Sequence, residues 1–352
     1  MVRYSEIIRN HGEERDASPS GETATDTTSQ DPVRFSSIAT KEGLGEKGSS
    51  LSPRDIELAG SIHSQLVDHL TEVRKQVWNE MAFDIGTGIG LVESVVKAPP
   101  LIEKLYQATI YFYYSENYII AHMINALIYA LKIGAGLQYA EDKLLELGTS
   151  ALYYDIGLFR IPASITCKEE KLTEPEIALV RKHPEIGRHL LAPFSEENPW
   201  LTRVAFEHHE RESGTHGYPL GIKGSEICEY AKIMGLVDTY EAMIHNRPHR
   251  KALSQHISVR EMIKSKNLLF SPRIIKAFLE EMGLYPIGSF VRLNNKEIYE
   301  VVGTNKEHPM KPVVRLKFNS RGNPAEEENI IDLTEHPILY VKEAVDRDDL
   351  SL

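Results

Sequence analysis

The chain has 352 residues, of which 41% are hydrophobic and 26% are charged. This composition is typical of a soluble globular protein of about two domains and excludes a chain that is disordered throughout. The net charge of −11 argues against binding to duplex nucleic acid, which depends on neutralising phosphates, but leaves room for a small phosphorylated ligand held by a few arginines.

The sequence carries none of the usual signs of export or membrane insertion. The two cysteines, Cys167 and Cys228, are too few for a disulfide framework. No apolar run reaches the ~18 residues of a membrane span, and residues 1–16 lack the apolar core of a signal peptide. We therefore expect a cytoplasmic protein with no membrane partner.

The N-terminal part of the chain predicts a disordered tail followed by helices. Residues 1–51 are rich in Ser, Thr, Gly, Asp and Glu and poor in bulky apolar side chains. Ser52-Pro53 is a plausible helix start, and helical patterning follows over Ile56–Trp78. The glycine-rich segment Asp84–Gly90 follows a helix and lacks the spacing of a dinucleotide-binding loop, so it predicts a connecting loop.

A series of helices is expected over the middle of the chain. Residues Leu101–Ile133 are apolar almost all round the helix, which indicates a buried helix with His122 and Asn125 as its polar exceptions. Residues 210–224 contain five glycine or proline positions and predict a loop. Other helices are predicted over 141–155, from a capping box at Thr173–Glu176, and over Trp200–His209, Ile227–Met243, Ser254–Lys266 and Ser271–Met282.

The hydrophobic period changes after Tyr285-Pro286. The alternation of Val314, Leu316 and Phe318 with charged residues predicts a half-buried strand. The expected fold class is therefore mainly α, a helical bundle with a small C-terminal β module. We expect a tail over 1–51, a helical segment over 52–110, a helical domain over 111–284, the β module over 285–345 and an acidic tail over 346–352.

Four features of the helical region could carry chemistry. They are the pair His208-His209 at a helix end, the carboxylate Asp238 on an apolar stripe, Asp155 beside a glycine break, and His183, whose neighbour Pro184 is expected to bend its helix. A charged carboxylate on an apolar stripe is costly unless it is paired or binds a metal. Histidines and aspartates that converge from several helices commonly form metal sites.

Three of the candidate residues also have a plain structural interpretation. His122 could be a hydrogen-bonded core histidine, and His183 could be a cap or kink residue. Asp238 could pair with Arg247 or Arg250. Taken singly, these readings are favoured over the functional ones.

Taken in order, however, the motifs resemble those of the HD-GYP family of phosphohydrolases. The resemblance extends from about Asn117 to Gly283. The segments that carry it are Leu152–Pro162, Lys182–Gly187, His208–Arg211 followed by Gly217-Tyr218-Pro219, Val237–Met243 and Asn246–Arg250. The β module also resembles a tail that often follows these domains.

The resemblance implies an HD-domain bundle that hydrolyses cyclic di-GMP, a bacterial second messenger, or a related cyclic dinucleotide. It implies a divalent transition metal, iron or manganese, with Asp155 bridging two ions. It further implies that Arg247 and Arg250 contact phosphate and that Gly217 and Tyr218 border the substrate. The implied metal ligands are His122, Asp155, His183, His208, His209 and Asp238.

Two departures from the family pattern make the expected site asymmetric. Tyr154 stands where the family has a histidine ligand, and Leu158 stands where it has a phosphate-binding lysine. One metal keeps the full set Asp155, His183, His208 and His209, whereas the other keeps only His122, Asp155 and Asp238. We therefore expect one firm site, one weak site and a slow enzyme. The alternative is a degenerate module that acts as a cyclic-dinucleotide receptor or binds a signalling protein, and the sequence also leaves a homodimer open.

Overall fold

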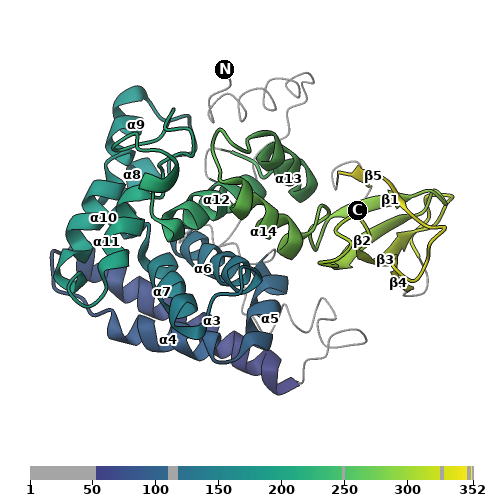
Figure 1. Cartoon of the computed structure of the whole chain (residues 1–352), viewed down its shortest axis with the longest axis horizontal. Coiled ribbons are helices and arrows are strands. Elements are labelled where there is room, and N and C mark those ends of the chain that lie inside the picture. Colours follow the sequence, from purple (N-terminus) through teal and green to yellow (C-terminus); the bar gives the residue numbers. More distant parts are fainter. Residues whose placement is uncertain (1–52, 110–117, 248–249, 326–328, 347–349, 351–352) are drawn as a thin grey trace, which may run out of the picture.

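The computed structural model describes residues 53–109, 118–247, 250–325, 329–346 and 350. Within these residues, a bundle of helices is followed by a small sheet at one side (Figure 1). This arrangement confirms the predicted fold class, mainly α with a C-terminal β module. The longer helices are α3 (Pro53–Trp78), α4 (Gly86–Val96), α5 (Pro99–Thr109), α6 (Tyr118–Gly136), α7 (Glu141–Tyr153), α10 (His183–Leu191), α11 (Pro199–Glu207), α12 (Glu229–Ile244), α13 (Gln255–Lys264) and α14 (Pro272–Met282).

Short helical segments join these helices around the site. They are η1 (Ile156–Arg160), α8 (Ala163–Thr166), α9 (Glu174–Val180), η2 (Ala192–Phe194) and η3 (Gly224–Glu226). The capping box predicted at the start of α9 is present, since the Glu176 carboxylate accepts the backbone N–H of Thr173 at 2.7 Å. The segment 210–224 contains no regular helix or strand until η3 begins, as its glycines and prolines predict.

Helix α6 lies at the centre of the bundle. It packs against α5, α7, α12 and α14, and all of its residues from Ile119 to Gly134 are buried. By length and composition it could cross a membrane, but 89% of its apolar window is covered by the rest of the protein. The all-round apolar pattern thus correctly indicated a buried helix, and it fixes His122 deep inside the molecule.

Two of the local predictions are wrong. The glycine-rich segment Asp84–Gly90 is not a loop throughout, because α4 begins at Gly86. The Asp84 carboxylate accepts the N–H groups of Gly86 and Thr87 at 3.0 and 3.1 Å and so satisfies donors at the helix start. Pro184 does not bend a helix. It lies in the first turn of α10, where its missing N–H costs nothing.

Other predictions fall wholly or partly outside the described residues. The tail over 1–51 lies outside them, as does most of the acidic tail over 346–352. The helix predicted over Leu101–Ile133 is described as α5 and α6, and residues 110–117 between them lie outside the described part. The division of the chain into domains therefore stays a prediction.

The C-terminal strands form one antiparallel sheet in the order β4-β3-β2-β1-β5. The strands are β1 (Phe290–Leu293), β2 (Ile298–Gly303), β3 (Val313–Phe318), β4 (Ile330–Asp332) and β5 (Val341–Val345). The sheet lies beyond α14 in Figure 1, away from the centre of the bundle. It is tied to the helices by Lys306, which forms an ion pair with the buried carboxylate of Glu281 on α14.

Candidate metal centre

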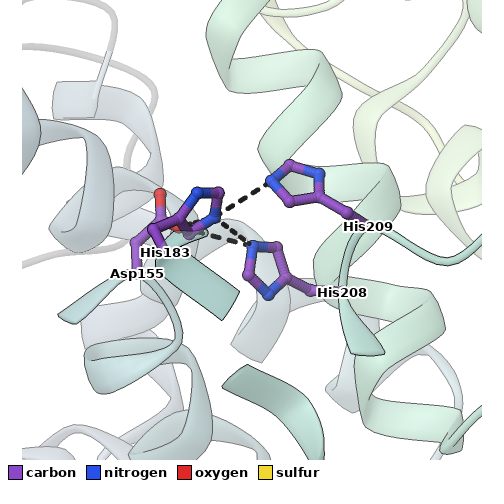
Figure 2. A group of neighbouring side chains, drawn as sticks. All are labelled: Asp155, His183, His208 and His209. Carbon is purple, nitrogen blue, oxygen red and sulfur yellow. Dashed lines mark hydrogen bonds and ion pairs between the residues drawn. The ribbon is translucent and has the colours of Figure 1, made fainter. Parts of the chain in front are cut away.

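Four side chains meet in a buried group at the heart of the bundle. Asp155 follows α7, His183 opens α10, and His208 and His209 follow the last turn of α11. Nε2 of His183 lies 3.1 Å from Nε2 of both His208 and His209. Oδ1 of Asp155 lies 3.1 Å from Nε2 of His183 and 3.3 Å from Nε2 of His208 (Figure 2). We call this set the first group.

The backbone fixes the orientation of two of these imidazole rings. Nδ1 of His183 donates to the carbonyl of Val180 at 2.7 Å, and Nδ1 of His208 donates to the carbonyl of Ala205 at 3.0 Å. A neutral ring that donates from Nδ1 carries its lone pair on Nε2. Both lone pairs therefore point into the group, as they do in histidines that bind a metal.

The donor atoms of the first group fit a divalent cation. Among the described residues, no hydrogen-bond donor reaches the buried oxygen Oδ1 of Asp155. Donor atoms held about 2.1 Å from one ion at right angles lie about 3.0 Å apart, close to the separations found here. Nitrogen lone pairs that converge on an unprotonated oxygen repel one another unless a cation lies between them.

The protonation of the first group also suits a metal. Burial lowers the pKa of His209 well below its ordinary value, and the neighbouring His208 and His183 lower it further, so the ring stays neutral. Burial alone would raise the pKa of Asp155, but His183, His122 and His208 together hold it well below its ordinary value. A neutral imidazole and an ionised carboxylate are the forms that bind metals.

A second group shares Asp155 with the first. Its other members are His122 on α6 and Asp238 on α12. Nε2 of His122 lies 3.0 Å from Oδ1 of Asp238 and 3.6 Å from Oδ2 of Asp155. Asp155 thus presents one oxygen to each group, which is the geometry of a bridging carboxylate.

Two further residues change the second group: Tyr154, the departure from the family pattern noted above, and Glu241, which the motifs did not assign. The hydroxyl of Tyr154 lies 2.7 Å from Nε2 of His122 and 3.3 Å from Oδ1 of Asp238. On the other side of the ring, Nδ1 of His122 donates to the carboxylate of Glu241. Glu241 lies three residues after Asp238, on the same face of α12, and this spacing is the one signal in the sequence that could have identified it.

The carboxylates around His122 favour a proton on this ring. Burial alone would lower the pKa of His122, but Glu241, Asp155 and Asp238 raise it well above its ordinary value. Glu241 is held in turn by Asn125 at 3.1 Å and by His245 at 2.9 Å. A protonated imidazole cannot bind a metal, so the second group fits an ion less well than the first.

The loop after His209 forms one wall of the site. The Tyr218 ring stacks on the His209 ring, with centroids 4.5 Å apart and planes 20° from parallel. Glu210 holds the loop, because its Oε1 accepts the N–H groups of Leu220 and Gly221. A Cβ at Gly217 would lie 2.9 Å from Oε2 of Glu210 and 2.9 Å from the backbone nitrogen of Arg211. This lack of space explains why a glycine is needed there.

The arginines predicted to contact substrate have different surroundings. Arg247 lines a small cavity beside His122 and Glu241. Arg250 donates to the carbonyls of Ala242 and Met243 in the last turn of α12 and to that of Lys251, the residue that follows it. A third guanidinium, that of the exposed Arg181, lies 5.4 Å from the centre of the Tyr218 ring, and the motifs did not predict it.

Two family models match this chain. Residues 104–274 match the model described as HD domain, and residues 290–352 match the model described as KOW domain associated with HD domain. A solved structure of an HDG"Y"P protein from Bdellovibrio bacteriovorus superposes with a TM-score of 0.52 at 14% identity, covering 67% of this chain and 74% of that one. At that identity the match supports the shared fold only.

Similar curated proteins act on cyclic dinucleotides. A cyclic di-GMP phosphodiesterase of Pseudomonas aeruginosa is 30% identical over 62% of this chain and 52% of its own length. The cyclic di-GMP phosphodiesterase PdeB of Borreliella burgdorferi is 30% identical over 57% of this chain and 52% of its own. A 3'3'-cGAMP-specific phosphodiesterase of Vibrio cholerae is 28% identical over 48% and 36%. This chain therefore spans about half the length of the curated relatives it matches most extensively.

Proposed function

We propose, from the match of residues 104–274 to the HD domain family and from the similarity to cyclic di-GMP phosphodiesterases, that this chain is a metal-dependent phosphodiesterase that hydrolyses a cyclic dinucleotide, cyclic di-GMP first among them. The observation that carries the proposal is the first group. A buried carboxylate oxygen of Asp155, which accepts no hydrogen bond from the described part of the chain, faces the Nε2 atoms of His183 and His208, and His209 completes the set. No apolar packing requirement explains such a cluster, whereas a metal-assisted attack on a phosphodiester needs it.

Asp155, His183, His208 and His209 would hold an iron or manganese ion. When bound, such an ion supplies a nucleophile from water at neutral pH and offsets charge on the phosphate. His122, Asp155 and Asp238 form the weaker of the two sites. Because Asp155 belongs to both groups, its carboxylate fixes where the first group lies relative to the second.

The remaining roles belong to substrate binding. Arg247 lines the cavity next to the second group, where its planar guanidinium can donate hydrogen bonds to two oxygens of a phosphate. Tyr218 and Gly217 form the wall beside His209, where an aromatic face can stack on a base. Arg250 is the least suited of the four, because its guanidinium already donates to the carbonyls of Ala242 and Lys251.

The test is cleavage of cyclic di-GMP by protein loaded anaerobically with Fe²⁺ or Mn²⁺. We expect cleavage that is lost on chelation and lost in the double variant His208→Ala with His209→Ala, together with the metal. His189→Ala is the matched control, since His189 is exposed on α10 and lies outside both groups. Normal metal content in the double variant would overturn the assigned site.

The second candidate function is a receptor that binds the dinucleotide without cleaving it. It is favoured by two observations: the Tyr154 hydroxyl contacts Nε2 of His122, and Leu158 replaces a lysine of the family pattern. Calorimetry with cyclic di-GMP separates the two functions. Binding of intact ligand by the metal-loaded protein, without cleavage over many hours, would favour the receptor. Cleavage in the same sample would favour the enzyme.

A further inference from the structure

The hydroxyl of Tyr154 lies among the donor atoms of the second group. It is 2.7 Å from Nε2 of His122 and 3.3 Å from Oδ1 of Asp238, which are two of the three donor atoms of that group. The third donor is Asp155, the next residue along the chain. The phenol therefore contacts the atoms that would have to bind a second ion.

The ring of His122 can bind an ion only in its neutral form, in which Nε2 has a single lone pair in the ring plane, and the Tyr154 hydroxyl lies 2.7 Å from that nitrogen. Nδ1 of His122 faces the Glu241 carboxylate, which can only accept, so Nδ1 carries a hydrogen. In a neutral ring Nε2 is then an acceptor, and the Tyr154 O–H is the donor at 2.7 Å. An ion would need the same lone pair, so the phenol and the ion compete for one position.

The Tyr154 side chain has no room to turn away. It is fully buried, and its ring packs edge-on against His208, with centroids 5.0 Å apart and an angle of 88° between the planes. The same ring lies 6.1 Å from the centre of the His122 ring. Moving it would open the packed interior between α6 and α11, which is costly at native packing density.

We propose that the Tyr154 hydroxyl takes the place of a second metal ion, so that this chain holds one ion, in the first group. The inference rests on the metal site of the proposed function, but it does not depend on turnover. A phenol that occupies the ion's position has a different consequence from a site that merely lacks one ligand. A site that only lacks one ligand still fills at high metal concentration, whereas a site whose donor atoms are bonded to a phenol does not.

The substitution Tyr154→Phe removes the hydroxyl but keeps the ring, and so distinguishes an occupied ion position from a missing ligand. In Tyr154→Phe, Nε2 of His122 and Oδ1 of Asp238 lose their phenol partner, and the donors His122, Asp155 and Asp238 remain. We expect Tyr154→Phe and Tyr154→His each to bind two Mn²⁺ ions per chain at saturation, against one for the unmodified protein. Tyr153→Phe is the matched control, because its hydroxyl is also buried but contacts His69, away from both groups.

The outcomes are measured as Mn²⁺ per chain by elemental analysis and as the electron paramagnetic resonance spectrum of Mn²⁺. A single-ion spectrum for the unmodified chain and for Tyr153→Phe, with a spin-coupled pair in both Tyr154 variants, supports the proposal. A second ion in Tyr154→His alone would show a missing ligand instead, and no second ion in either variant would show that Tyr154 is not the obstacle.

The unmodified protein tests the proposal even if the variants fail to fold. A spin-coupled pair in its spectrum would overturn the proposal outright. So would a tyrosinate-to-iron charge-transfer band in the oxidised iron-loaded protein, because it would make Tyr154 a ligand. Absence of cyclic di-GMP cleavage in a chain that holds one ion would count against the proposed function and leave this inference standing.

Discussion

The carboxylate of Glu241 on α12 binds Nδ1 of His122 on α6, across 119 residues of sequence. Both side chains are buried, and the opposite nitrogen of the same ring faces Asp238 and Tyr154. Burial alone would raise the pKa of Glu241, but His122 and His245 hold it well below its ordinary value. This pair therefore determines how the second group is oriented and how much charge it carries.

Replacing Glu241 by alanine should be strongly destabilising. The change leaves His122 buried without its main carboxylate partner, and breaking a buried pair typically costs ~3 kcal/mol or more. The free energy of unfolding, measured with denaturant, should fall by that amount. Glu93→Ala is the control, because the Glu93–Lys97 pair is exposed and solvent screens it, so its loss should change the stability little. Equal effects of the two changes would contradict the assigned role.

Gly157 should not tolerate a side chain. A Cβ there would lie 2.0 Å from the carbonyl oxygen of His183 and 2.8 Å from the backbone nitrogen of Gly187, so η1 and α10 would have to separate. We expect Gly157→Ala to lose ~3 kcal/mol of stability and to bind metal more weakly, because His183 moves.

Gly90 provides the comparison for this prediction. It lies in α4, and a Cβ there meets no atom of the described chain within 4 Å. Gly90→Ala should therefore stabilise the protein by ~0.5 kcal/mol. Thermal melting and metal content of both variants check the prediction, and a neutral Gly157→Ala would contradict it.

Arg247 and Arg250 should respond differently to truncation. Arg250→Ala removes hydrogen bonds to the carbonyls of Ala242 in α12 and of Lys251, so it should cost ~1.5 kcal/mol of stability. Arg247→Ala should weaken cyclic di-GMP binding about 10-fold with little change in melting temperature. Calorimetry and melting curves on both variants distinguish the roles. Loss of stability with unchanged affinity in Arg247→Ala would instead support an ion pair with Asp238.

The buried His63 should make the protein sensitive to mild acid. Burial lowers its pKa from 6.5 to about 4, so between these values the unfolded chain binds a proton that the folded chain does not. Stability therefore falls as the pH falls from 6.5 toward 4, by ~2.5 kcal/mol between pH 7.5 and 4.5.

His63→Leu should remove this contribution. Its free energy of unfolding should decline less steeply between pH 7.5 and 4.5 than that of the unmodified chain. His308→Gln, at an exposed position, should leave the pH profile unchanged. Parallel profiles for all three proteins would count against His63 as a source of acid sensitivity.

Much of the fold follows from local patterns in the sequence. The apolar circumference of α6 predicts its burial, and Thr173 with Glu176 predicts the start of α9. The same reasoning fails at Asp84–Gly90, because glycines are poor helix formers and the capping by Asp84 outweighs that preference. It also fails at Pro184, since a proline that starts a helix and one that bends a helix look alike without the preceding boundary.

The site was predicted less completely than the fold. The order of the motifs indicated that Asp155 and the histidines would meet, and the structure places their donor atoms together. The roles of Tyr154 and Glu241 could not be predicted in the same way. They depend on contacts with His122 across 32 and 119 residues, and such distances are set by helix packing rather than by spacing along the chain.

The first group draws its donors from three places between residues 155 and 209, and none of them is close to the others until the bundle has formed. An unfolded chain therefore offers no comparable site, and metal binding and folding are thermodynamically linked. Each tenfold rise in free metal above the dissociation constant should add ~1.4 kcal/mol to the stability of the folded chain. The melting temperature should therefore rise with the concentration of free metal, and a chelator should lower it, as a mild denaturant does.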